Sequence, residues 1–196
     1  MQKKILITGF DPFGGEKINP SWEAVKLLPD FVGDYQIVKL QIPTVFGKAV
    51  RTVLEKAQEV APDAIVCVGQ AGGRAAVTPE VIGINLIEAN IADNEGNQPC
   101  CVPVVDGGAA AYFATLPVRE MVAKIKSENL PSALSFSAGA FVCNELLYTL
   151  LRSFDGTKTR VGFIHVPFLP EQAKPGIPSM KIDDIVRALT LALSVL

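Results

Sequence analysis

The chain contains a single histidine, His165, and this count limits the chemistry that the protein can perform. Imidazole is the one side chain whose ordinary pKa lies near neutral pH, so His165, near the end of the apolar run 161–166, could carry protons during catalysis. A site with several histidine ligands is excluded within one chain. The alternative is a core histidine whose polar atoms are satisfied by neighbours.

Cys143 is the candidate nucleophile that such a histidine would serve. It follows a glycine-containing loop and begins a pattern of leucines with helical spacing. A thiol at the start of a helix faces unpaired N–H groups and the positive end of the helix dipole, which stabilise a thiolate. A small buried residue tolerated at a helix start gives the same pattern. The presence of one histidine at the end of a strand favours a Cys–His pair.

A Cys–His pair works best with a third group that holds the imidazole in one tautomer and orientation. The candidates are Glu80, Asp93, Glu95 and Asn144. Taken by itself, Glu80 follows Thr-Pro and is typical of an exposed carboxylate in a turn. Asp93 and Glu95 stand in a polar stretch that is typical of a solvated loop.

The other three cysteines show no pattern of a zinc motif or a disulfide framework. Cys67 lies within an apolar run, which predicts a buried and inert thiol. Cys100 and Cys101 are adjacent in a loop, where ordinary thiols are expected and a redox-active pair is the alternative.

Two glycine-rich loops indicate binding functions. Residues 69–74 follow an expected strand and end in Arg74, as in a loop that cradles a phosphate, although the spacing fits neither nucleotide fingerprint. A phosphate- or nucleotide-binding α/β protein is therefore one alternative function. Residues 9–15 contain Phe10 and Phe13, which suit an apolar pocket better than a phosphate site.

Apolar runs rich in β-branched residues alternate with segments of helical period. Strands are expected at 4–8, 35–42, 64–69, 81–86, 134–137 and 161–166, and helices at 21–28, 46–60, 117–127, 144–154 and 182–196. This alternation predicts a mostly parallel sheet covered by helices on both faces, within a single domain spanning 1–196. Functional groups of such folds gather at the carboxyl ends of the strands.

Composition narrows the class of protein further. The formal net charge is −2 and no dense cluster of lysine and arginine occurs, which argues against a nucleic-acid partner. The apolar carboxyl-terminal segment is too short to span a bilayer, and the amino-terminal apolar run is too short for a signal peptide. We therefore expect a cytosolic protein with no membrane partner.

Five segments together resemble the pyroglutamyl peptidase (pyrrolidone-carboxylate peptidase) family of cysteine peptidases. They are residues 9–15, 69–74, 93–99, 139–144 and 162–167, and they occur in order along nearly the whole chain. The resemblance implies a Cys143–His165–Glu80 triad on a three-layer α/β/α sandwich, with no metal, no cofactor, a cytosolic setting and a homotetramer.

The resemblance also implies a substrate, a peptide whose N-terminus is blocked as pyroglutamate (5-oxoproline). Because this ring is a neutral lactam, we expect an apolar slot with a few hydrogen bonds. The walls of that slot would be Phe10, Phe13, Phe141 and Val142, and Gln70 would be a polar contact.

The chain departs from the family pattern at two places. Asn90 stands where an arginine associated with the active site is usual, so backbone N–H groups around Cys143 are the expected oxyanion donors. Residues 135–138 also differ from the usual run before the nucleophile. These departures leave open a second alternative, a catalytically weak relative that binds blocked peptides.

Overall fold

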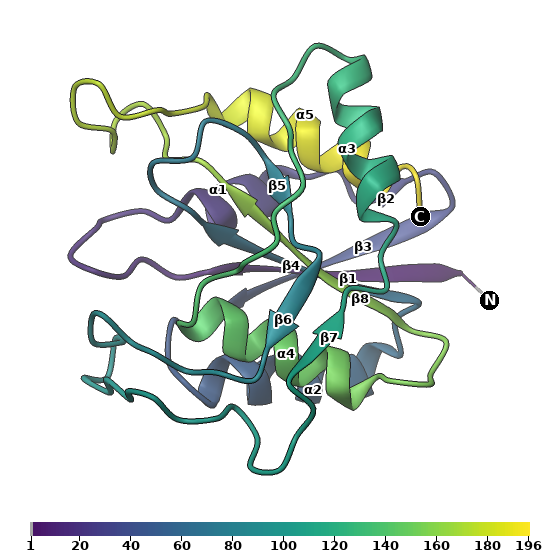
Figure 1. The fold of residues 1–196 in the computed structure, drawn as a ribbon. Coiled ribbons are helices and arrows are strands. Elements are labelled where there is room, and N and C mark those ends of the chain that lie inside the picture. The colour runs from purple at the N-terminus through teal and green to yellow at the C-terminus, as the bar shows by residue number, and fades with distance from the viewer. Residues whose placement is uncertain (1) are drawn as a thin grey trace.

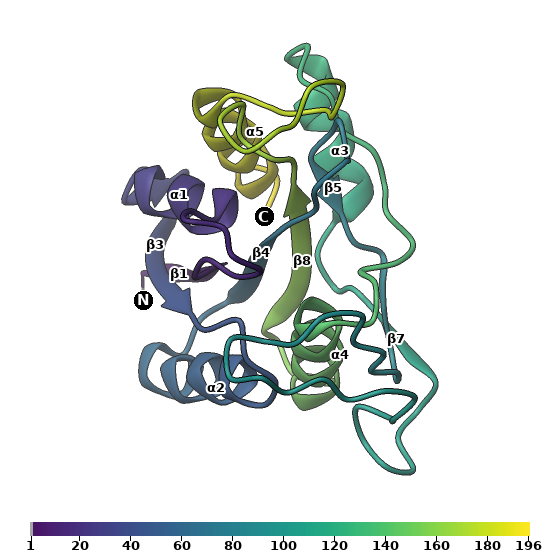
Figure 2. The same cartoon turned by 90° about the vertical axis from the view of Figure 1, so that its left-hand side faces the viewer.

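A computed structural model describes residues 2–196 and contains one six-stranded sheet with the strand order β2-β3-β1-β4-β8-β5 (Figures 1 and 2). The four central strands, β1 (Lys3–Phe10), β3 (Tyr35–Ile42), β4 (Ala64–Gln70) and β8 (Arg160–Val166), run parallel. The short edge strands β2 (Phe31–Val32) and β5 (Thr78–Pro79) are antiparallel to their neighbours. β1, β4 and β8 are almost continuously buried, as expected for parallel strands covered on both faces.

Within the described residues, five helices cover the sheet. In Figure 1, α1 (Pro20–Leu27), α3 (Val118–Ser127) and α5 (Ile182–Leu193) lie above it, and α2 (Lys48–Val60) and α4 (Val142–Ser153) lie below it. The predicted three-layer α/β/α sandwich with a mostly parallel sheet is confirmed. Within residues 2–196, none of the helices is long and apolar enough to cross a membrane.

The alternation of side chains along the strands gives each face its own core. On β8, Val161 and Phe163 pack in the core shared with α2 and α4, whereas Ile164 and Val166 pack in the core shared with α1, α3 and α5. His165 follows the same alternation as Phe163, and the two rings lie 4.7 Å apart between centroids. The imidazole is therefore on the side of the sheet that α4 covers.

One strand prediction is correct only in part, and another is wrong. The expected strand 81–86 contains the shorter strand β6 (Ile82–Ile84), which does not join the main sheet but pairs with β7 (Ala111–Phe113) in a separate two-stranded sheet against α4. The close approach favours a glycine, because a Cβ on Gly83 would lie only 3.0 Å from the backbone nitrogen of Tyr148. The expected strand 134–137 forms only one isolated bridge, between Ser135 and Glu80, and Phe136 within it is 65% exposed, so this side chain does not face a core.

Candidate active site

The site lies at the carboxyl ends of the neighbouring strands β4 and β8. Gly69 of β4 is the register partner of His165 on β8, and both residues face α4. His165 is 3% exposed. The location agrees with the expectation that functional groups gather where parallel strands end.

Cys143 reaches this edge of the sheet from the first turn of α4. Phe141 is the N-cap residue of that helix, and the half-buried Cys143 is its second helical residue. A Cβ on Gly69 would lie 3.1 Å from the Cys143 sulfur and 2.7 Å from Cζ of Phe163. The missing side chain of Gly69 thus makes the space that the thiol occupies, directly beside the strand position of His165.

Glu80 approaches His165 from the edge strand β5. Thr78 pairs with His165 in the antiparallel β5–β8 ladder, and the Glu80 N–H donates to the Phe163 carbonyl at 2.9 Å. The Glu80 carboxylate oxygen Oε1 then lies 2.7 Å from His165 Nδ1. Glu80 is fully buried, so the residue-level interpretation of an exposed turn carboxylate is wrong. The bond engages Nδ1 and leaves Nε2 as the ring nitrogen for a reacting partner.

Arg74 holds the same carboxylate from the other side. Its Nη1 donates to Glu80 Oε1 at 2.8 Å and to the Thr78 hydroxyl at 2.6 Å, and its Nη2 donates to the Ser137 carbonyl at 3.1 Å. The guanidinium is therefore already engaged within the protein, which removes the group that the phosphate-cradle interpretation would use for an anion. Thr78 and Glu80 follow Arg74 by only four and six residues, but no motif in the sequence predicts this contact.

Burial and charge set the protonation states. Burial by itself would raise the pKa of Glu80, but the hydrogen bond and charge of His165, together with Arg74, bring that pKa below its ordinary value. Burial lowers the pKa of His165, although Glu80 opposes the shift. Burial, with the nearby Glu80 charge, raises the pKa of the Cys143 thiol to about 12. The resting pair is therefore a neutral thiol and a neutral imidazole, since burial outweighs the stabilisation expected from the helix end.

The remaining candidates for the third group have structural contacts instead. Asp93 accepts hydrogen bonds from the backbone of Phe46 and of its own loop, at 2.9–3.0 Å. Glu95 pairs with Lys48 at the surface, and Asn144 binds the backbone around β6. Of the residues that the structure describes, only Glu80 is within hydrogen-bonding distance of the His165 ring.

The residues expected to line the substrate slot fall into two groups. The half-buried Phe13 and Phe141 lie together, 6.2 Å between ring centroids, and Phe46 meets Phe141 edge to face at 5.2 Å. Phe10 is 2% exposed and Val142 is fully buried, so they lie in the core behind this aromatic group. Phe46 was not among the predicted pocket residues, because it stands at the start of a helical pattern that is typical of a core-facing helix.

Gln70 lies at the end of β4, beyond Gly69. Its side-chain oxygen accepts a hydrogen bond from the Gln172 amide at 3.2 Å, and Gln172 also donates to the Ile18 carbonyl at 3.3 Å. Gln70 is thereby tied to the loop after β8 and to the loop after β1. Asn90, at the position of the usual arginine, is exposed.

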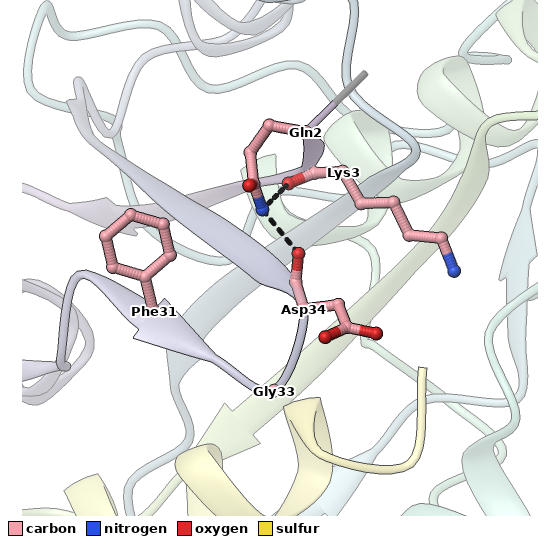
Figure 3. A pocket seen from close by; sticks show the side chains of 5 residues that line it. All are labelled: Gln2, Lys3, Phe31, Gly33 and Asp34. Carbon is pink, nitrogen blue, oxygen red and sulfur yellow. Dashed lines mark hydrogen bonds between the residues drawn. The ribbon is translucent and has the colours of Figure 1, made fainter.

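A separate hollow lies far from this chemistry. It is lined by residues at the amino ends of β1 and β3, namely Gln2, Lys3, Phe31, Gly33 and Asp34 (Figure 3). The Gln2 amide donates to the backbone carbonyls of Asp34 and Lys3. The hollow lies at the amino ends of the parallel strands, whereas the His165 site lies at their carboxyl ends, so the hollow is not part of that site.

Comparison with known proteins shows which proteins this chain is similar to. The family model described as pyroglutamyl peptidase matches residues 3–196. A pyrrolidone-carboxylate peptidase of Bacillus cereus is 50% identical over 98% of this chain and 92% of its own length. The crystal structure of Bacillus amyloliquefaciens pyroglutamyl peptidase I superposes with a TM-score of 0.95 at 49% identity, covering 98% of this chain and 95% of that one. A mutant pyrrolidone carboxyl peptidase of Pyrococcus furiosus gives a TM-score of 0.93 at 38% identity, covering 98% and 97%. The chain therefore belongs to the pyroglutamyl peptidase family.

Proposed function

We propose that this protein is a cysteine exopeptidase that removes the N-terminal pyroglutamyl residue from peptides, with Cys143 as nucleophile, His165 as acid and base, and Glu80 as the group that orients His165. The observation that carries this function is the 2.7 Å contact between Glu80 and His165 beside the thiol that occupies the space over Gly69. The family match over residues 3–196 supports it.

The resting protonation states favour proton transfer during attack rather than before it. As the substrate binds, His165 Nε2 takes the proton of the Cys143 thiol while the sulfur attacks the pyroglutamyl carbonyl carbon. The charge that forms on the imidazole is stabilised by the Glu80 carboxylate, which has a lowered pKa and stays ionised. The charge on the carbonyl oxygen meets the first N–H groups of α4, including that of Cys143.

Collapse of the tetrahedral intermediate breaks the peptide bond. Protonated His165 gives its proton to the leaving amine, and the pyroglutamyl group remains on Cys143 as a thioester. His165 then removes a proton from water, which attacks the thioester and releases pyroglutamate and the thiol. All the proton transfers use side chains of this chain, so the reaction requires no metal and no cofactor.

The aromatic group near Cys143 suits the substrate. Phe13 and Phe141, with Phe46 at the edge, would bind the apolar faces of the lactam, and Phe10 and Val142 would support them from the core. Gln70, at the end of β4, would supply a hydrogen bond to the lactam amide. A ring without an ammonium group needs no carboxylate in this slot.

The test is release of amine from a pyroglutamyl-linked fluorogenic substrate. Wild-type protein should turn the substrate over, and Cys143→Ala should abolish release while keeping the far-ultraviolet circular dichroism of the wild type. Cys100→Ala is the matched control, an exposed cysteine that should leave turnover unchanged. Turnover that survives in Cys143→Ala would eliminate this nucleophile.

The same assay tests the alternative that the protein is a catalytically weak relative. This alternative arises because the exposed Asn90 stands where an arginine is usual in the family. That alternative requires wild-type protein to bind a pyroglutamyl peptide, measured by calorimetry, without releasing its amine. Turnover by the wild type rejects it.

We also propose a cytosolic homotetramer built from one catalytic domain over residues 1–196. Exposed aromatic side chains support self-association, because Phe113 is 71% exposed and Phe136 is 65% exposed. Light scattering coupled to size exclusion measures the mass directly, and a monomer at micromolar concentration would contradict the tetramer.

A further inference from the structure

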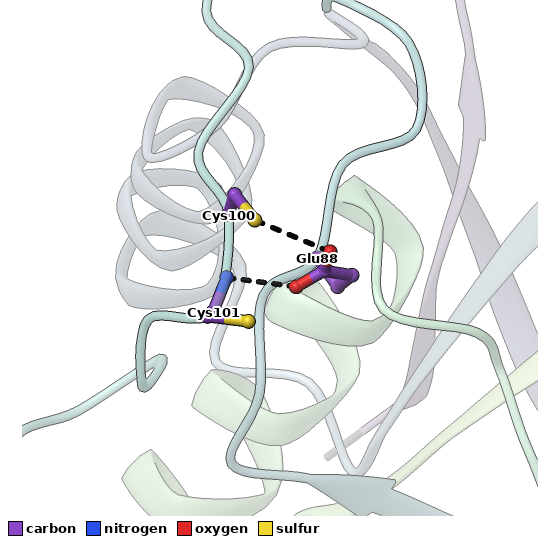
Figure 4. Close-up of side chains that lie close together, drawn as sticks. All are labelled: Glu88, Cys100 and Cys101. Carbon is purple, nitrogen blue, oxygen red and sulfur yellow. Dashed lines mark hydrogen bonds between the residues drawn. The ribbon is translucent and has the colours of Figure 1, made fainter.

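Two adjacent cysteines and a glutamate form a compact cluster in the long connection between β6 and β7. One ligand atom each from Glu88, Cys100 and Cys101 lies within 4.8 Å of the other two, and within residues 2–196 no other three histidine, cysteine or acidic side chains meet this condition. Figure 4 shows the two sulfurs on the side of the chain that faces the Glu88 carboxylate. The cysteines are exposed and Glu88 is half-buried, so the cluster is open to solvent.

The backbone orients all three groups. Adjacent side chains of an extended chain point to opposite sides, but Cys101 has a φ of +51°, in the left-handed region, which turns its sulfur to the side of Cys100. The Glu88 carboxylate accepts the Cys101 N–H at 2.8 Å through Oε2 and lies 3.2 Å from the Cys100 sulfur through Oε1. These two contacts fix the carboxylate beside the two cysteines.

Paired hydrogen bonds hold the two segments that carry these residues. Ile87 and Val102 exchange backbone bonds of 2.7 and 3.2 Å, and the Ala89 N–H donates to the Pro99 carbonyl at 2.9 Å. Glu88 lies between two of these anchored positions, and the cysteines lie opposite it. The cluster is therefore supported on a hairpin-like frame, although its side chains are at the surface.

We propose that Glu88, Cys100 and Cys101 form a binding site for a thiophilic divalent cation of the Zn²⁺ class. Two thiolates select zinc or cadmium over magnesium and calcium, which prefer oxygen ligands. Zinc–sulfur bonds of about 2.3 Å and zinc–oxygen bonds of about 2.0–2.2 Å place tetrahedral ligand atoms roughly 3.5–3.8 Å apart. The three ligand atoms already lie within 4.8 Å of one another, so ligation would draw them closer together, and the exposed side of the cluster would leave the fourth position to water.

The charge of the cluster suits a divalent cation. Each thiol that coordinates the cation releases its proton to solvent, and the cation then offsets the negative charge of the Glu88 carboxylate and the two thiolates.

The site is joined to the nucleophile loop. The Glu88 N–H donates to the carbonyl of Ala140, three residues before Cys143, at 2.9 Å. An ion bound by the Glu88 side chain would hold the segment to which that loop is attached. The metal site itself does not depend on the proposed peptidase function.

The test uses the full chain with Cys143→Ser, so that the active-site thiol cannot bind the metal, in the presence of a phosphine reductant. Cadmium is the probe, because thiolate coordination gives an ultraviolet charge-transfer band. We expect the band to saturate at one cadmium per chain and to disappear when zinc is added in excess. Adding Cys100→Ser and Cys101→Ser should remove the band.

Glu88→Gln tests the third ligand in the same background. We expect the band to remain with cadmium affinity weakened roughly tenfold or more, whereas Glu95→Gln, a carboxylate in the same connection, should leave the affinity unchanged. Because the substituted cysteines are exposed, their variants should keep the wild-type circular dichroism. The absence of a saturable band, its persistence without both cysteines, or unchanged affinity in Glu88→Gln would each overturn the site as described.

Discussion

Replacing Glu80 with glutamine isolates the charge that the mechanism assigns to this residue. The glutamine oxygen can keep the hydrogen bond to His165 Nδ1, which lies 2.7 Å from Glu80 Oε1 in the wild type. The amide nitrogen can take the place of Oε2, which is buried and has no hydrogen-bond partner among the described residues. The substitution thus removes a negative charge with little change of shape.

The size of the effect follows from the distance and the surroundings. Two opposite charges with centres about 4 Å apart attract by about 4 kcal/mol at the effective dielectric constant of about 20 that applies in proteins. Arg74 donates to the same oxygen at 2.8 Å and already neutralises part of this charge. We therefore expect a loss of roughly 2–4 kcal/mol in stabilisation of the imidazolium formed during attack. This corresponds to a decrease in kcat/KM of roughly 30- to 1,000-fold.

The assay is steady-state hydrolysis of a pyroglutamyl-linked fluorogenic substrate from pH 5 to 9. We expect kcat to carry the loss with KM little changed, because Glu80 does not reach the substrate. Since the Glu80 hydrogen bond and charge raise the pKa of His165 against burial, their weakening should move the acid limb of the kcat/KM profile to lower pH. A residue that only stabilised the fold would leave that limb in place.

The matched control is Glu128→Gln, which removes a carboxylate from an exposed ion pair with Arg187. It should leave both kcat and the pH profile unchanged. The reasoning is refuted if folded Glu80→Gln has a kcat/KM within threefold of the wild type and an unmoved acid limb.

Three further predictions concern the surroundings of the site. Gly69→Ala would place a Cβ 2.7 Å from the ring of Phe163 and 3.1 Å from the Cys143 sulfur. We expect kcat to fall more than tenfold and the free energy of unfolding, measured in urea, to fall by about 1–3 kcal/mol. An unchanged kcat would show that the thiol does not need this space. Burial keeps the pKa of His165 lower in the native protein than in the unfolded chain. The free energy of unfolding should therefore decrease as pH falls through about 6.5, and it should decrease less in His165→Asn. Urea titrations between pH 7 and 5 that gave both proteins the same dependence of this free energy on pH would contradict the prediction. Asn144→Ala removes three hydrogen bonds to the backbone around β6 and leaves buried backbone groups without partners. We expect the free energy of unfolding, measured by urea titration, to fall by about 2–4 kcal/mol. A decrease below about 0.5 kcal/mol would mean that water replaces the lost hydrogen bonds.

Much of the architecture follows from local patterns in the sequence. The expected strand 35–42 coincides with β3, and the helices that cover both faces lie where the apolar spacing predicts them, within a few residues at their ends. These elements are predictable because their amphipathic or continuous apolar patterns repeat over eight or more residues. The single histidine and the cysteine at a helix start also indicate the type of chemistry without any coordinates.

The position of Glu80, the third member of the site, is explained only by the tertiary structure. By its own sequence context Glu80 is typical of an exposed turn, and only the family resemblance assigned it a role. It is buried because β5, two residues long and without periodic signal, pairs with β8. That pairing joins residues 85 positions apart. Local patterns carry no information on such contacts, since they arise when separate elements close around a shared core.

The cluster of Glu88, Cys100 and Cys101 is a second contact that local sequence patterns do not predict. The adjacent cysteines are visible in the sequence, where they read as ordinary loop thiols. Their common orientation depends on the left-handed backbone of Cys101, and the pairing of two segments brings Glu88 beside them. The sequence by itself determined the layers of the fold and the reactive residue types, whereas long-range pairing and one unusual backbone angle decided which side chains meet.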